Sequence, residues 1–335
     1  MKWIEAAFAV LLIIFSLTVC VSAHSPVLTV GDSGIDDAIH IDDPFKSWAY
    51  YGTFADAGSV SYYEFDLESG DRLWFSVFTP QKDAVYPEAV IIGPGIENTG
   101  ELPDGVVVLE NNGYIVVPGE SPDMPDYEPF TPAANYQWLK YEYFAEVPGT
   151  YYIAMVNEGT GPGSFGLAVG YLEEFTISEW GLIPISIANV RIWEGNSPAF
   201  VIGFPLLVVI FGLLYLMRFK KKPVRMNPET ILGASGGLLY LAGSAFMLIQ
   251  ALMALYKTGF EASFGVTMIF ILIPLILGIL ILRYMVKPAK YKAIKLLVLG
   301  AVGLVVWAGY VIGPILVILS GVMILFDKKG GAKQP

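Results

Sequence analysis

Two histidines are the only imidazole side chains among the 335 residues, and one of them follows a predicted cleavage site. Residues 1–23 are predicted to form a secretory signal that ends in the small-residue site Val21-Ser22-Ala23, with an uncleaved anchor as the alternative. Cleavage would give His24 a free α-amine beside its imidazole, and these two nitrogens form a bidentate chelate. His40 would complete a copper site. His24 and His40 are therefore the candidate metal ligands, with a loosely docked N-terminal histidine as the alternative.

Calcium is the second candidate cofactor. Residues 24–60 are predicted to be an acidic N-terminal segment, and Ca²⁺ takes oxygen ligands. Five aspartates follow one another closely in it: Asp32, Asp36, Asp37, Asp42 and Asp43. Their spacing does not match an EF-hand loop, so a solvated acidic linker is the alternative.

Motifs that carry catalysis are sparse. No H-E-x-x-H helix and no phosphate-binding G-x-x-x-x-G-K-[ST] loop occurs. A Ser-His-Asp triad would need one of the two histidines. Cys20 is the only cysteine and lies in the predicted signal, so a cleaved chain would have no disulfide, zinc–thiolate site or cysteine nucleophile. We expect no catalytic residues and no enzyme.

Composition indicates a membrane protein. Hydrophobic residues make up 55% of the chain and charged residues 15%, whereas soluble domains average about 25% charged residues. Four apolar blocks are each long enough to span a bilayer, which takes about 20 residues. They are Pro198–Met217, Ile231–Tyr256, Ser263–Met285 and Ala293–Phe326. The expected location is the plasma membrane, with the lipid bilayer as a partner.

Charge is divided unevenly along the chain. Residues 24–198 hold 27 acidic and 5 basic residues, while the remainder holds 4 acidic and 15 basic residues. Loops rich in Lys and Arg stay cytoplasmic. We therefore expect residues 24–198 to be extracellular and the C-terminus to be cytoplasmic. The acidic part would repel phosphates, which argues against nucleic acid as a partner.

The fourth apolar block decides the number of spans. Its 34 residues would measure about 51 Å as one helix, against a hydrocarbon core of about 30 Å. Gly309, Gly313 and Pro314 favour a turn in its middle. Two helices keep the basic clusters on one side, whereas one long tilted helix, the alternative, does not. The five predicted spans are 198–217, 231–256, 263–285, 295–308 and 312–326, followed by a cytoplasmic tail at 327–335.

Short β segments separated by glycine and proline turns occupy residues 61–171. Frequent turns between short strands are typical of an antiparallel sandwich. The predicted strands are Tyr62–Leu67, Arg72–Phe78, Ala89–Ile92, Val106–Leu109, Tyr114–Val117, Leu139–Phe144, Thr150–Val156 and Ser164–Tyr171. The fold class is thus multidomain, with an extracellular all-β, jelly-roll-like sandwich and an α-helical transmembrane bundle.

Two runs of this segment carry a family resemblance. Residues 62–73, YYEFDLESGDRL, resemble the opening strand pair of the bacterial and archaeal pre-peptidase C-terminal (PPC) domain. Val147–Ala154, VPGTYYIA, and Gly163–Val169, GSFGLAV, resemble its closing pair. The resemblance implies a jelly-roll-like sandwich that is usually a non-catalytic accessory or binding module.

The last four helical segments resemble small glycine-rich prokaryotic and archaeal four-helix membrane proteins of unknown function. The residues that carry this resemblance are Ile231–Gly237 and Ile312–Leu316. It implies a compact bundle and no activity. The family resemblance also indicates an archaeal source. Gly233-x-x-x-Gly237 and Gly309-x-x-x-Gly313 would let helix backbones approach closely, with a lipid-facing helix as the alternative.

Residues 172–197 join the two halves. Thr176-x-x-Glu179 predicts a capping box that opens a helix. Pro184 argues against a continuous helix there. We interpret the segment as an interfacial one beside the membrane, with a last piece of sandwich core as the alternative.

A recognition role fits these features best. Aromatic residues at 127–130, 136–138 and 141–144 would offer a stacking surface for an envelope glycan or a membrane-protein partner, unless they fill the sandwich core. We expect an acidic sandwich displayed for recognition or envelope interaction without catalysis. The alternatives are an extracytoplasmic copper-binding protein that uses His24 and an accessory subunit of a channel or transporter. The oligomeric state stays open.

Overall fold

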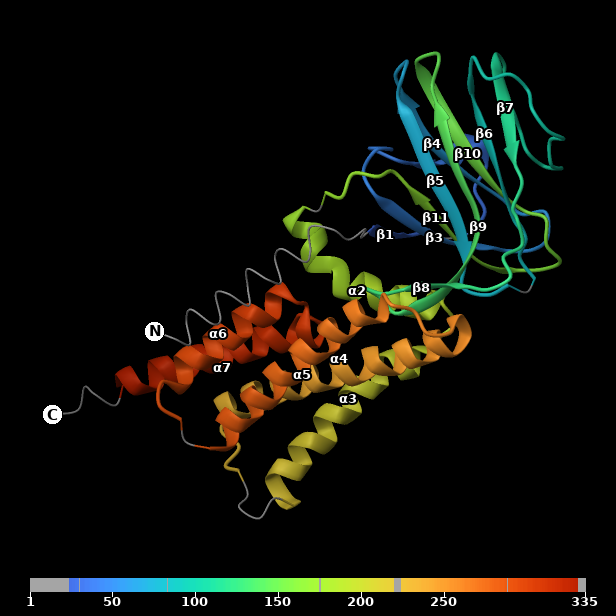
Figure 1. The fold of residues 1–335 in the computed structure, drawn as a ribbon. Helices are drawn as coiled ribbons and strands as arrows, with labels where there is room; N and C mark the ends of the chain where they lie inside the picture. Colours follow the sequence, from blue (N-terminus) through green and yellow to red (C-terminus); the bar gives the residue numbers. More distant parts are fainter. Residues whose placement is uncertain are drawn as a thin grey trace.

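A computed structural model describes residues 24–29, 31–82, 84–174, 176–219, 224–287 and 289–330. The predicted signal at residues 1–23 and its cleavage site lie outside this part of the chain. The structure has an N-terminal β-sandwich and a C-terminal helical region, and helix α2 (Ile177–Trp193) lies between them (Figure 1). The predicted combination of a β-sandwich and a helical region is confirmed, whereas the placement of the sandwich outside the cell stays a prediction.

Two mixed sheets form the sandwich. One has the order β1-β3-β11-β5-β9-β8 and the other the order β2-β4-β10-β6-β7. The strands are β1 (Ser25–Leu28), β2 (Ile39–His40), β3 (Trp48–Phe54), β4 (Val60–Leu67), β5 (Arg72–Thr79), β6 (Pro87–Pro94), β7 (Asn112–Val117), β8 (Asp126–Glu128), β9 (Ala133–Phe144), β10 (Gly149–Asn157) and β11 (Gly163–Val169).

The sandwich core follows the two-residue period of its strands. Successive side chains of a strand point to opposite faces, so every second residue of these strands enters the core. In the antiparallel β4–β10 pair, Phe65 lies opposite Tyr151, and both are fully buried. Phe75 and Phe165 enter the core from the other sheet. The two aromatic-rich inner faces therefore hold the sheets together.

The sandwich begins earlier than predicted. Strands β1, β2 and β3 come from residues 24–60, so this segment belongs to the sheets and is not a separate acidic segment. The β1–β3 and β2–β4 pairs are parallel, and the sheets are therefore mixed where we expected antiparallel ones. These pairings join a short edge strand to a distant partner, which strand spacing alone does not reveal.

One predicted strand is absent from the described sheets. Residues 106–109 form a loop that covers the second sheet. A side chain takes the place of a neighbouring strand here, because the N–H of Val107 donates to the Tyr62 hydroxyl at 2.6 Å. Val106 is buried against the second sheet, whereas Val107 and Leu109 are exposed. The apolar run therefore forms neither a paired strand nor a fully buried segment.

The helical region contains three helices long and apolar enough to cross a membrane. In the described part of the chain they are α3 (Pro198–Leu214, extended to Arg218 by the π-helical turn η3, Tyr215–Phe219), α4 (Pro228–Thr258) and α5 (Phe264–Val286). Two further helices follow, α6 (Lys292–Val305) and α7 (Ile312–Gly330), with a shorter apolar run over Ile312–Asp327.

The fourth apolar block is divided into two helices that lie side by side (Figure 1). Helix α6 ends at Val305, three residues before the predicted end. The connection contains the short 3-10 helix η4 (Ala308–Tyr310) and four residues with positive φ, among them Gly309 at +56° and Val311 at +62°. A β-branched residue at positive φ is strained, and the surrounding helices must hold it there.

Helix α4 lies at the centre of the bundle and contacts α3, α5 and α7. Its glycines stand where neighbouring chains come closest. A Cβ on Gly236 would lie 2.6 Å from the Gly313 carbonyl oxygen of α7, and one on Gly237 would lie 2.9 Å from Ile281 of α5. Close backbone approach therefore occurs between Gly236 and Gly313 and, from the second predicted motif, at Gly309, whose Cβ would lie 2.9 Å from the Tyr240 backbone nitrogen.

The two ends of the bundle differ in charge. The C-terminal part of α4 lies against β8 and β9, and at the start of α5 Thr267 donates to the Pro129 carbonyl beside β8. Lys257 lies at this sandwich end, whereas the opposite ends of the helices carry the larger basic group Arg218, Arg225, Arg283, Lys287, Lys290, Lys292 and Lys295. The acidic sandwich and these residues are therefore separated by the length of the helices.

Candidate functional site at the junction of the sandwich and the helices

Helix α2 begins with the predicted capping box. The Thr176 hydroxyl accepts from the N–H of Glu179 at 3.2 Å, and the Glu179 carboxylate accepts from the N–H of Thr176 at 2.8 Å. The helix then continues through residue 184 to Trp193, so the expected interruption at Pro184 is wrong. Contacts at both ends of α2 compensate for the hydrogen bond that a proline cannot donate.

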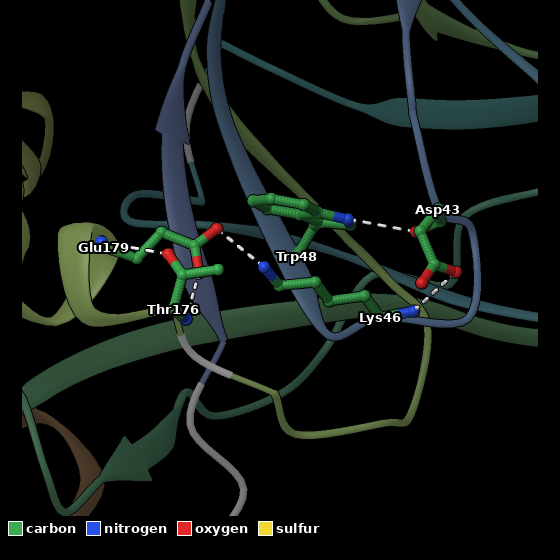
Figure 2. Close-up of polar contacts among 5 residues, drawn as sticks. All are labelled: Asp43, Lys46, Trp48, Thr176 and Glu179. Atoms are coloured by element: carbon green, nitrogen blue, oxygen red, sulfur yellow. Dashed lines mark hydrogen bonds and ion pairs between the residues drawn. The ribbon is translucent and has the colours of Figure 1, made fainter.

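The first turn of α2 is tied to the sandwich by a cation (Figure 2). The Lys46 ammonium donates to Glu179 Oε1 at 2.6 Å and lies 4.2 Å from the Trp48 ring centroid. The Trp48 indole N–H donates to the Asp43 carbonyl at 3.0 Å. Partial burial alone would raise the pKa of Glu179, but the hydrogen bonds from Lys46 and Thr176 hold it below its ordinary value.

The last turn of α2 covers the outer face of the first sheet. Trp193 meets Tyr51 edge-on with ring centroids 4.8 Å apart, and its indole N–H donates to the Gly52 carbonyl at 2.8 Å. Its backbone carbonyl also accepts from Ser164 of β11. The sheet face that a simple sandwich leaves in water is therefore covered here.

A buried ion pair follows at the same end of α2. Arg191 is 3% exposed, and its Nη1 donates to Glu194 Oε2 and to the Pro132 carbonyl, both at 2.8 Å. This guanidinium thus joins α2 to the loop between β8 and β9. A buried charge needs such partners because removal from water is costly.

The β8–β9 region contacts helix α5 directly. The Thr267 hydroxyl donates to the Pro129 carbonyl at 2.7 Å, so it accepts from the Tyr127 hydroxyl, 2.8 Å away. Phe130 meets Phe270 of α5 with ring centroids 5.5 Å apart. These aromatic residues therefore contact the bundle and are not a free stacking surface.

The later aromatic residues are divided between core and surface. Trp138 is buried, and its indole N–H donates to Thr79 Oγ1 at 2.8 Å. Tyr141 and Tyr143 pack against the sandwich core, while Phe144 is exposed. The core interpretation accordingly holds for Trp138, Tyr141 and Tyr143.

A cavity of about 330 Å³ lies between the outer face of the first sheet, α2 and α5. Its walls combine aromatic rings, including Tyr51, Phe78 and Phe270, with the carboxylates of Glu128 and Glu194. Burial raises the pKa of both carboxyl groups, although Phe130 N–H and Arg191 act in the opposite direction. Sequence reasoning missed this site because its walls come from six strands and two helices that are far apart in the chain.

A second cavity of about 140 Å³ adjoins the first. Phe130, Thr131, Ile187, Phe270 and Trp307 line both. The remaining walls come mainly from apolar residues of α3, α4, α5 and the strained α6–α7 connection, together with Arg191. The two cavities thus run from a polar junction into the helical region.

The structure places the two predicted metal ligands on different sheets. His24 precedes β1 and lines the larger cavity. Its Nδ1 lies 2.6 Å from Ser47 Oγ, and burial lowers the pKa of its imidazole. His40 lies on β2 at an exposed position, 3.3 Å from Glu64 Oε1. The structure shows no contact that joins them, and the α-amine required for copper depends on cleavage outside the described residues. The copper site stays a prediction.

The predicted calcium ligands serve other roles where the structure describes them. Asp32 accepts from Ser59, and Asp43 accepts from the backbone N–H groups of Phe45 and Lys46. Asp36 and Asp37 lie in the 3-10 helix η2 (Ile35–Asp37). In the described ranges, no three His, Cys, Asp or Glu side chains are grouped to hold a metal ion.

Comparison with solved structures adds a structural likeness. No family model and no curated protein matches the sequence. The pre-peptidase C-terminal domain of collagenase from Bacillus anthracis matches 44% of this chain and 96% of that domain, with 11% identity and a TM-score of 0.20. Such a low score carries no argument, so the sandwich assignment rests on the strand pairing. The resemblance of the helices to archaeal proteins stays a prediction.

Proposed function

We propose that this chain is a non-catalytic recognition protein of the plasma membrane, whose helices hold the acidic sandwich outside the cell. The observation that carries the proposal is the separation of charge along the molecule: the acidic sandwich docks at one end of the bundle, and most of the basic residues described in the helical region lie at the other end. Basic loops are retained in the cytoplasm, which supports an extracellular sandwich and a cytoplasmic C-terminus.

Five membrane crossings accompany this proposal. Three helices have the length and apolarity for a span, and the α6–α7 pair supports two shorter crossings that return the chain to the basic side. Docking through Arg191, Tyr127 and Thr267 favours a sandwich held in a fixed orientation at the membrane surface. A fixed orientation suits recognition of an envelope glycan or a neighbouring membrane protein.

Cysteine labelling tests the topology sharply, because Cys20 is the only natural cysteine. In a Cys20→Ser background, Glu110→Cys marks the sandwich and Lys287→Cys marks the basic end. A membrane-impermeant maleimide should label the first in intact cells and the second only after permeabilisation. The reverse pattern would contradict the proposed orientation.

Recognition is tested with the full chain in lipid nanodiscs as bait for solubilised envelope material. We expect retention of a glycan or a membrane protein above the level of empty nanodiscs, and the acidic surface predicts that high salt weakens it. Retention equal to that of empty nanodiscs contradicts recognition. A stoichiometric channel or transporter among the retained proteins would instead indicate an accessory subunit.

A further inference from the structure

The larger junction cavity contains more buried negative charge than positive charge. Glu128 and Glu194 both line it, and Asp126 lies at its more exposed edge. Among the described residues that line the two cavities, Arg191 is the sole guanidinium or ammonium, and its hydrogen bonds go to Glu194 and Pro132. Desolvation disfavours a carboxylate left without a cation, so a positively charged ligand would stabilise this arrangement.

A buried hydrogen-bond acceptor in the larger cavity also lacks a partner. Asn135 lines the larger cavity, and its buried Oδ1 accepts no hydrogen bond. Glu128, by contrast, accepts from the backbone N–H groups of Phe130 and Thr131, so the unsatisfied acceptor is Asn135 Oδ1. Buried acceptors of this kind are normally satisfied. The missing group is therefore a donor, and an ammonium with N–H bonds supplies both the donor and the charge.

The walls indicate the rest of the ligand. Aromatic rings surround the acidic groups, and a cation is attracted to such ring faces. The adjoining cavity extends among mainly apolar residues of the helices, including Phe246 and Met247 of α4 and Pro274 of α5. The volume of about 330 Å³ lies in the range of about 300–1,000 Å³ found for small-molecule sites.

We propose that the junction binds an amphiphile with a primary ammonium head, which Glu128, Glu194 and Asn135 receive in the larger cavity while the apolar tail enters the helical cavity. This site is separate from the acidic outer surface that the proposed function uses. A divalent metal fits it less well, because no three metal-binding side chains are grouped among the described residues.

The test uses the full chain in phosphatidylcholine nanodiscs and isothermal titration with three probes. Hexylammonium carries charge and N–H donors, hexyltrimethylammonium carries charge without donors, and hexan-1-ol lacks the charge. We expect hexylammonium to bind at least about tenfold more tightly than either of the others, since a hydrogen bond to a charged group contributes roughly 1.5–3 kcal/mol. Equal binding of the three probes, or no binding of hexylammonium, overturns the proposal.

Two glutamate variants locate the site. Glu128→Gln removes a buried charge and keeps an acceptor for the Phe130 N–H, whereas Glu110→Gln removes an exposed charge on the sandwich. The first should weaken hexylammonium binding about tenfold and the second should not change it. Unchanged binding in Glu128→Gln places the probe elsewhere and overturns the proposal. If that variant fails to fold, the probe series on the natural chain decides the question.

The ammonium group can come from a membrane lipid or from a free amine. Nanodiscs that contain phosphatidylethanolamine distinguish these sources. Weaker apparent binding of hexylammonium in those nanodiscs supports the site with an aminolipid as its occupant. Unchanged tight binding supports the site with a free amine as its occupant.

Discussion

Arg191 links three elements through a single buried guanidinium. Its partners are Glu194 and the Pro132 carbonyl, and Glu128 lies close enough for their charges to interact. Replacement by Met removes the cation that pairs with these buried carboxylates. An unpaired buried charge destabilises the fold by more than the intact ion pair stabilises it. We expect Arg191→Met to lower the free energy of unfolding by about 3–5 kcal/mol, measured by chemical denaturation in detergent.

Two further variants separate burial from simple loss of charge. Arg191→Met combined with Glu194→Gln should recover part of the loss, because fewer charges are left unpaired. Arg72→Met removes an ion pair with Glu142 in which both side chains are more than 40% exposed, and should cost about 0–1 kcal/mol. Equal losses for Arg191→Met and Arg72→Met would contradict a buried role for Arg191.

His24 makes stability depend on pH in a defined direction. Burial lowers the pKa of His24 below its ordinary value of 6.5, so the unfolded chain takes up the proton first. Its contribution is therefore fully present above pH 6.5 and is lost as pH falls through 6.5 toward the lower folded-state pKa. His24→Gln should abolish this part of the decline, measured as the difference between unfolding free energies of the two proteins across that range.

Ser47→Ala provides the control for the histidine. It removes the hydroxyl 2.6 Å from Nδ1 but leaves the imidazole buried. The pH dependence should persist in this variant at a lower overall stability. Parallel pH curves for the natural chain and His24→Gln would show that His24 does not titrate differently in the folded state.

At the scale of elements, close packing of α4 against α7 depends on the absence of a side chain at Gly236. A Cβ there would lie 2.6 Å from both the Gly313 carbonyl oxygen and a Val317 methyl group. We expect Gly236→Ala to destabilise the bundle by about 1–3 kcal/mol, seen as a lower temperature of unfolding in detergent. Gly203→Ala on α3 is the matched control, since nothing lies within 4 Å of its added Cβ. A similar loss at both positions would contradict the α4–α7 contact.

At the scale of the whole molecule, the sandwich and the bundle share hydrogen bonds through Thr267. Thr267→Val leaves the Pro129 carbonyl without its donor and the Tyr127 hydroxyl without its acceptor. Amide hydrogen exchange over residues 126–135 should rise about two- to tenfold, which corresponds to the roughly 0.5–1.5 kcal/mol of a typical hydrogen bond. The change is made in a helix of the bundle and is measured in the sandwich.

Thr258→Val is the control for this coupling, because its hydroxyl donates only to the neighbouring Gly259 carbonyl in the structure. Exchange over residues 126–135 should be unchanged in that variant. Unchanged exchange in Thr267→Val as well would indicate that the sandwich does not depend on α5.

Local chemistry made much of the fold predictable. The apolar blocks, the alternation around Tyr62–Leu67 and the Thr176–Glu179 capping box each depend on residues close together in the chain. The edge strands β1 and β2 were missed because short segments gain strand structure only from distant partners. Pro184 misled the prediction for α2, since contacts of that helix with the sandwich outweigh a local preference.

The sequence by itself determined that this protein joins a β-sandwich to apolar helices and divides its charge between them, because composition and periodicity report directly which surfaces avoid water. Only the tertiary structure decided that Glu128, Glu194, Arg191 and His24 gather around one junction. These residues are separated by up to 170 positions, so nothing in their spacing brings them together. Their proximity follows from the docking of α2 and α5 on the outer face of one sheet, which is a property of the folded molecule.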